Sequence, residues 1–124
     1  MTDEEVAALR RFQDAIRKIR QVYPRMEVGQ LEVLLSISTK PGIRGAEILQ
    51  EMQGIKSNSV YRTIKVLSDV EGEAGDGRRH GLNLITKTPD PLDSRAFQLV
   101  PTMAGRDLAE AVAAALTDSR PDRI

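Results

Sequence analysis

The 124-residue chain contains no cysteine and only one histidine, His80. Without thiols it forms no disulfide, no thiolate metal site and no thiol-based redox sensor. One histidine without cysteine gives a poor set of ligands for zinc or haem, so we expect no metal and no cofactor. His80 also lacks a recognisable nucleophile partner, and we therefore expect a protein that is not an enzyme.

Aromatic residues are equally scarce, with two Tyr and two Phe. This argues against a platform on which the bases of single-stranded nucleic acid stack. No apolar run approaches the roughly 20 residues that span a bilayer, and the first ten residues lack a signal-peptide core. We expect a cytoplasmic protein with no membrane partner. Because 18 Lys and Arg balance 18 Asp and Glu, any nucleic-acid face must be a local patch.

The sequence does contain helical periodicity, within a length typical of one domain spanning residues 1–124. Apolar residues recur every three or four positions, with Thr2, Ser57 and Thr102 as candidate N-caps. The helices expected on this basis are Asp3–Tyr23, Val28–Ser38, Gly45–Met52, 57–69 and Thr102–Leu116.

Two short segments alternate apolar and polar residues as strands do, Leu82–Lys87 and Arg95–Val100. Thr88–Ser94, with two prolines, would link them as a hairpin of moderate length. The segment Val70–Gly81 holds four glycines and mixed charge, which predicts a mobile loop. The expected fold is mainly α with a small β-hairpin.

Two short helices joined by a tight turn at Gly54 and followed by a hairpin are typical of a winged helix-turn-helix. In such a unit the second helix enters the DNA major groove, where Asn can bond adenine and Arg can bond guanine. An ordinary solvated helix face is the alternative, since exposed polar faces are the rule. The expected exposed set is Ser57, Asn58, Ser59, Tyr61, Arg62 and Lys65.

The proline-containing hairpin carries Ser94 and Arg95, with Lys87 on the partner strand. An arginine on a stiff turn suits a narrow minor groove, where the negative potential is enhanced. An exposed hairpin with a surface ion pair between Asp93 and Arg95 is the alternative. Cations of the loop, Arg78 and Arg79, either touch phosphate or are simply solvated.

The stretch PDPLDSRAFQLVPTMAG resembles the wing of the MarR-type winged-helix transcription regulators, in which Asp-x-Arg precedes an apolar strand and Thr-x-x-Gly opens a helix. Asp93, Arg95, Thr102 and Gly105 stand at those spacings. The stretch EILQEMQGIKSNSVYRTIKVL is similar to the helix-turn-helix of that family, and the resemblance covers roughly residues 30–113.

This resemblance implies that Asp93 braces Arg95 while Arg95 enters the minor groove. It places Ser57, Asn58, Ser59 and Arg62 in the major groove. It also implies that the N-terminal helix (1–24) and the C-terminal helix (102–117) pair with those of a second subunit. A DNA-binding core of residues 25–101, with its wing at 82–100, would lie between them.

The function expected from these patterns is a homodimeric, sequence-specific binder of double-stranded DNA, a transcriptional repressor that reads an inverted repeat. The alternative is a winged-helix protein-interaction module that has lost specific DNA binding. The balanced charge favours this alternative, as does Ser94, which stands where the family commonly has a second wing arginine. Whether a small-molecule effector acts on the protein is left open by the sequence.

Overall fold

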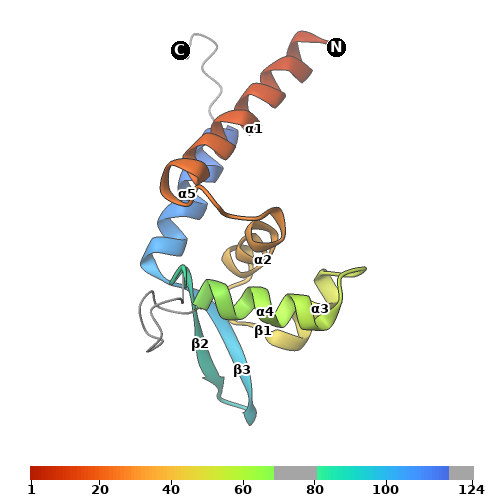
Figure 1. Ribbon diagram of the computed structural model, residues 1–124, viewed down its shortest axis with the longest axis vertical. Coiled ribbons are helices and arrows are strands. Elements are labelled where there is room, and N and C mark those ends of the chain that lie inside the picture. Colours follow the sequence, from red (N-terminus) through yellow and green to blue (C-terminus); the bar gives the residue numbers. More distant parts are fainter. Residues whose placement is uncertain (69–80, 118–124) are drawn as a thin grey trace. The chain divides into compact units, whose positions relative to one another are not determined.

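The computed structural model describes residues 1–68 and 81–117 (Figure 1). The elements are α1 (Asp3–Val22), α2 (Val28–Thr39), β1 (Ile43–Arg44), α3 (Gly45–Glu51), α4 (Ser57–Ser68), β2 (Ile85–Asp90), β3 (Asp93–Pro101) and α5 (Met103–Thr117). The expected class, mainly α with a small hairpin, is confirmed. The loop expected at Val70–Gly81 lies, except for its last residue, outside the described residues.

The chain divides into two compact units. The terminal unit holds Met1–Met26 together with α5 from Asp107 onward, and the central unit holds Glu27–Arg106. The boundary therefore falls within α5. None of the helices in the described ranges combines the length and the apolar character needed to cross a bilayer.

In the terminal unit, α1 begins as its sequence predicts. Thr2 Oγ1 accepts the backbone N–H of Glu5 at 3.1 Å, and the Glu5 carboxylate accepts the N–H of Thr2 at 2.8 Å. These reciprocal bonds form a capping box and hold the pKa of Glu5 below its ordinary value. The helix ends at Val22, where Tyr23 donates its N–H to Ile19 at 2.7 Å ahead of Pro24.

The apolar residues of the terminal unit are only partly buried. Ala15 and Ile19 are buried on α1, and Leu108, Val112 and Ala115 on α5. The helical spacing of α5 also predicts burial of Met103 and Leu116, which is wrong. Leu116 is 44% exposed, and Met103, in the part of α5 that belongs to the central unit, is 76% exposed. On α1 the exposed large apolar residues are Leu9, Phe12, Ile16 and Val22.

The central unit has its core between α2, α3, α4 and the sheet. The side chains of this core that are almost completely excluded from solvent are Val33, Leu34, Ile37, Ile48, Met52, Val60, Ile64, Leu67, Leu84, Ile85 and Leu99. On the short helix α3 the apolar spacing predicts burial of Ala46, Ile48, Leu49 and Met52. Ile48 and Met52 are buried and Leu49 is half-buried, but the prediction is wrong for Ala46, which is exposed.

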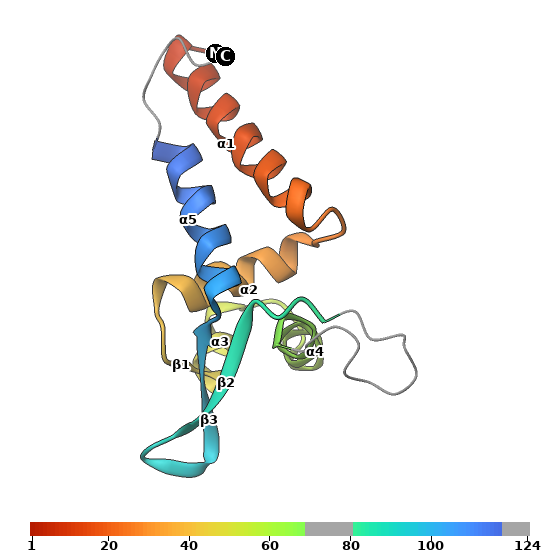
Figure 2. The same cartoon turned by 90° about the vertical axis from the view of Figure 1, so that its left-hand side faces the viewer.

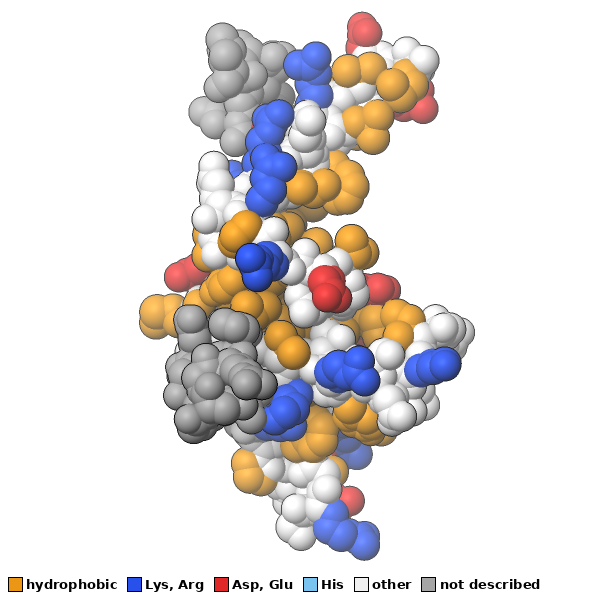
Figure 3. Space-filling view, in the orientation of Figure 1, with side chains coloured by type: hydrophobic (Ala, Val, Ile, Leu, Met, Phe, Trp, Pro, Cys, Tyr) orange, Lys and Arg blue, Asp and Glu red, His pale blue; other side chains and the backbone are white. Residues whose placement is uncertain are grey.

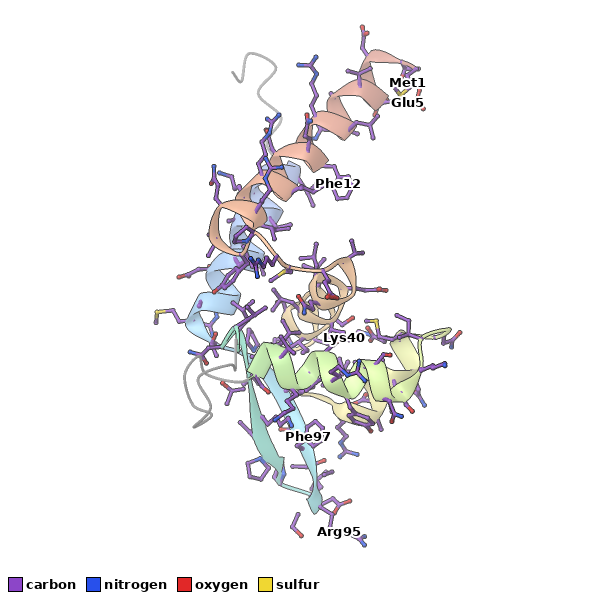
Figure 4. All side chains as sticks on the ribbon, viewed as in Figure 1. Met1, Glu5, Phe12, Lys40, Arg95 and Phe97 are labelled. Carbon is purple, nitrogen blue, oxygen red and sulfur yellow. The ribbon has the colours of Figure 1, made fainter. Side chains whose placement is uncertain are left out.

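An ion pair ties the end of α2 to the end of α3. Lys40 Nζ donates to the carboxylate of Glu51, which also accepts a hydrogen bond from Ser36. These bonds, Lys40 first, lower the pKa of Glu51, and the same carboxylate raises the pKa of Lys40. Lys40 is labelled in Figure 4 just below α2.

The sheet has three antiparallel strands in the order β1-β3-β2. Strands β2 and β3 form the long hairpin of Figure 2. The strand β1, which has only two residues, was not predicted from the sequence. The expected hairpin loop was also too long: β2 runs to Asp90 and β3 starts at Asp93, so only Pro91 and Leu92 form the turn. Pro89 is accommodated inside β2, opposite Phe97, because β2 has a partner strand on one side only.

Candidate nucleic-acid interface

Helix α4 has one buried face and one polar face. Val60, Ile64 and Leu67 lie at 2% exposure or less and hold the helix on the core, as predicted. One detail differs: Val60 donates its N–H to the carbonyl of Lys56 at 3.2 Å, so Ser57 is already inside the helix and is not its cap. The first turn thus presents three short polar side chains, Ser57, Asn58 and Ser59, to solvent.

The polar face of α4 is positively charged in a chain whose net charge is zero. All six residues predicted for this face are exposed: Ser57, Asn58, Ser59, Tyr61, Arg62 and Lys65. From Met52 to Ser68 the sequence holds three cations, Lys56, Arg62 and Lys65, and no acid. Figure 3 shows Lys and Arg side chains over this part of the central unit. The required local patch is therefore present, and Lys56 extends it beyond the predicted residues.

Backbone hydrogen bonds fasten the end of α4 to the beginning of the hairpin. Leu82 donates its N–H to the carbonyl of Val66 at 2.9 Å, and Leu84 donates to Leu67 at 2.8 Å. These donors satisfy carbonyls that the last turn of a helix otherwise leaves without a partner. The base of the hairpin is thus fixed to α4 directly, whatever the length of the intervening segment.

The start of α5 is fastened to the same point. Thr102 donates its N–H to Leu84 at 3.0 Å and its hydroxyl to the carbonyl of Asn83 at 2.8 Å. The Thr102 hydroxyl oxygen also accepts the N–H of Gly105 at 3.1 Å, which caps the helix as the sequence predicts. The Thr-x-x-Gly segment therefore joins β3, α5 and the base of the hairpin.

At the tip of the hairpin, the side chain of Arg95 is 92% exposed and extends away from the body of the central unit (Figure 4). Asp93 Oδ1 accepts the backbone N–H of Arg95 at 3.0 Å, and it lies 3.7 Å from the Nε atom. The carboxylate consequently fixes the backbone at Arg95 more firmly than it holds the guanidinium. Ser94, between them, is also exposed.

Lys87 is exposed on β2, but its ammonium group lies over a neighbouring ring. Its Nζ is 5.2 Å from the centroid of Phe97, a cation–π geometry. The Phe97 ring in turn packs against Gly45, where a Cβ would lie 2.6 Å from the ring. Lys87 thus lies close to the start of α3 and apart from the hairpin tip.

Sequence reasoning missed Arg44 and Asp90. Arg44 Nε lies 2.8 Å from Oδ2 of Asp90, whose side chain is completely buried. The other oxygen, Oδ1, accepts the N–H of Leu92 in the turn at 2.9 Å. An Asp two residues before a turn N–H is a local signal that the sequence does contain. The partnership with Arg44 has no local signal, because the two residues are far apart in the chain.

Within residues 1–68 and 81–117, no group of three or more His, Cys, Asp or Glu side chains is placed to hold a metal ion. His80, Arg78 and Arg79 lie outside the described residues. The described candidate site consists of hydrogen-bond donors, cations and a projecting hairpin.

No protein-family model and no curated protein matches the sequence. Solved structures do match. The transcriptional regulator Tm0710 of Thermotoga maritima is 25% identical, with a TM-score of 0.65 over 91% of this chain and 68% of that one. RV1404 of Mycobacterium tuberculosis gives 22% identity and a TM-score of 0.68 over 92% and 70% of the two chains.

The S. aureus MepR–DNA complex gives 19% identity and a TM-score of 0.64 over 90% of this chain and 79% of that one. MarR itself superposes with a TM-score of 0.58 at 17% identity, over 90% and 70% of the two chains. The five helices and the three-stranded antiparallel sheet in the described part of this chain match the fold of these structures. This chain is a winged helix-turn-helix protein with the MarR-type fold.

Proposed function

We propose that the protein is a transcription regulator that binds double-stranded DNA in a sequence-specific way. The observation that carries this proposal is the pairing, in one compact unit, of an acid-free polar helix face with a hairpin whose arginine is almost fully exposed. The MepR and AbfR structures, which have the same fold, were solved bound to DNA. This supports the same ligand class here.

In this proposal α4 enters the major groove with its N-terminal turn. Ser57, Asn58, Ser59 and Arg62 read base edges, because these side chains offer the donors and acceptors that groove readout needs. Other residues contact the sugar-phosphate backbone of the DNA. These are Tyr61 and Lys65, further along the same exposed face, and Lys87 and Ser94 on the hairpin. Arg95 enters the minor groove, where its charge meets the strongest negative potential.

The proposed active form is a homodimer. A contiguous apolar strip on α1, formed by Leu9, Phe12 and Ile16, is exposed in the single chain at 53%, 54% and 42%. Exposed apolar strips of this kind are typical of protein–protein contacts. Two recognition helices related by a twofold axis read an inverted repeat, with half-sites about one helical turn apart. Binding such an operator in the cytoplasm would repress the adjacent gene.

Selecting bound fragments from genomic DNA tests this function and supplies the operator at once. The selected fragments should share an inverted repeat. If each subunit neutralises about three or four phosphates, the logarithm of the affinity should fall with the logarithm of salt concentration with a slope of about −6. An affinity for DNA that does not change with salt concentration would contradict the proposal. If no fragment is retained even at low salt, the balanced net charge and Ser94 favour the protein-interaction alternative.

A further inference from the structure

The buried carboxylate of Asp90 lies at the outer end of β2, one residue before the two-residue turn. It accepts the N–H of Leu92 with Oδ1, while Oδ2 lies 2.8 Å from Nε of Arg44. A buried carboxylate is retained only where charges and donors compensate it. Arg44 supplies the charge through an ion pair in which its N–H is not aligned as a hydrogen bond to Oδ2, and the turn supplies the hydrogen-bond donor to Oδ1.

Arg44 belongs to the helix-turn-helix side of the central unit. It pairs with Gln98 in the β1–β3 ladder and directly precedes α3, where its N–H donates to Glu47 at 2.9 Å. Its guanidinium therefore connects the start of α3 to the outer end of the hairpin. The base of the hairpin has a separate attachment, the hydrogen bonds from Leu82 and Leu84 to the end of α4.

We propose that Arg44 is a positioning residue for DNA recognition: through Asp90 it fixes the hairpin tip, and with it Arg95, relative to α4. The inference rests on the proposed function. Without this contact the hairpin is held at its base, by the β1–β3 pairing and by the packing of Phe97 on Gly45, so its tip samples more directions and DNA binding must offset the entropy of ordering it. A second attachment near the turn removes that freedom before DNA arrives.

A competing explanation is that Arg44, whose side chain is 45% exposed, simply contributes a positive charge to the DNA-binding face. The two explanations differ in what they predict for Asp90. If only charge matters, Asp90→Asn removes a negative charge and strengthens DNA binding. If Arg44 acts through Asp90, the same variant weakens binding although the protein has become more positive. Asn retains an oxygen that can accept the Leu92 N–H, so the turn itself is preserved.

A double-mutant cycle on operator affinity separates these explanations. We expect Arg44→Ala and Asp90→Asn each to weaken binding by about tenfold in the wild-type background, within the range of one lost specific contact. In an Arg95→Ala background the same changes should cost less than about twofold, since the side chain they position is gone. In an Arg62→Ala background they should retain their full effect. Lys40→Ala, which breaks the Lys40–Glu51 ion pair of the same unit, serves as the control for a general loss of stability.

A measurement without DNA tests the positioning directly. Because the chain lacks cysteine, spin labels can be placed at Ser94→Cys on the hairpin and Gln50→Cys on α3 without other changes. The distance distribution between them should be narrow in the wild-type background and clearly broader after Arg44→Ala or Asp90→Asn. Lys40→Ala should leave its width unchanged.

Additive losses in the cycle, stronger binding by Asp90→Asn, or an unchanged label distribution would each overturn the positioning role. If the wild-type protein binds no DNA at all, the proposed function fails. The label distribution still decides whether Arg44 holds the hairpin.

Discussion

The backbone carbonyl of Leu84 occupies the space in which a side chain at position 105 would begin. A Cβ on Gly105 would lie 2.0 Å from the Leu84 oxygen and 3.0 Å from its carbonyl carbon. The same oxygen accepts the N–H of Thr102, so it cannot move away without breaking the hydrogen bond that joins the start of α5 to the base of the hairpin. Glycine at this position is therefore a steric requirement of the fold.

Gly105→Ala should lower the free energy of unfolding by at least about 2 kcal/mol, because backbone must shift to admit the methyl group. Gly29→Ala is the matched control, since a Cβ at this helical position of α2 meets nothing within 4 Å. That change should stabilise the protein by about 0.5–1 kcal/mol. Urea unfolding measures both, and equal effects of the two variants would refute the steric argument.

Arg95→Ala should weaken operator binding by about 1–3 kcal/mol, the usual value of one good specific contact. The melting temperature should barely change, because the side chain is 92% exposed. The control is Arg106→Ala, which removes an exposed arginine in the first turn of α5. This residue follows the end of β3 that lies away from the hairpin tip, so its loss should leave affinity nearly unchanged. Unaltered affinity in Arg95→Ala would end the argument for minor-groove insertion.

Asp93→Ala should weaken operator binding in the same direction but by less than Arg95→Ala. The carboxylate accepts the Arg95 N–H at 3.0 Å, so its loss frees the backbone that aims the arginine without removing the cation. Asp93→Asn retains an acceptor oxygen and should keep most of the affinity. Titrations with labelled operator compare the three proteins, and a larger loss in Asn than in Ala would show that Asp93 acts by another route.

Arg62→Ala should relax the base preference at particular operator positions, as expected of a side chain that reads base edges. Arg95→Ala, by contrast, should change the preference for narrow minor-groove sequences. Selecting binding sites from a randomised library with each variant distinguishes the two patterns. A uniform loss of affinity in Arg62→Ala, with the selected motif unchanged, would make Arg62 a phosphate contact.

The stability of the fold at low pH should depend on the ionisation of Glu51. Its pKa lies below the ordinary 4.5 because it accepts hydrogen bonds from Lys40 and Ser36. Because the pKa of Glu51 is lower in the folded than in the unfolded protein, its ion pair contributes fully to the free energy of unfolding above the unfolded-state pKa. This contribution is lost as the pH falls through the folded-state pKa. Lys40→Gln should therefore flatten the decline of melting temperature below about pH 4.5. If both proteins decline in parallel, the ion pair contributes nothing measurable.

The parts of the fold that sequence predicts well are those determined by near neighbours. Thr2 caps α1 through Glu5, and Thr102 caps α5 through Gly105, because each cap bonds a residue three positions later. The buried face of α4 follows from the helical spacing of its apolar residues in the same way. The exposed residues of α4 are the complement of that face, so they too could be predicted.

The parts that were missed depend on distant partners. The strand Ile43–Arg44 has too few residues to show alternation and exists because β3 lies beside it. The loop expected at Thr88–Ser94 is too long, because Pro89 is typical of a turn, whereas tertiary pairing keeps it in β2. The pairing of Arg44 with Asp90 could not be predicted, since no local sequence pattern around either residue indicates the other as its partner.

The outer strand of the sheet, β2, has a consequence for how the protein behaves at high concentration. A strand with one unpaired side offers a template on which another chain can add its own strand and begin aggregation. On β2 this is opposed by Pro89, which has no N–H to donate, by the charged Lys87, and by the irregularity in pairing between Pro89 and Asp90. Pro89, which makes the bounds of the hairpin hard to predict from the sequence, thus helps to prevent β2 from pairing with a strand of another molecule.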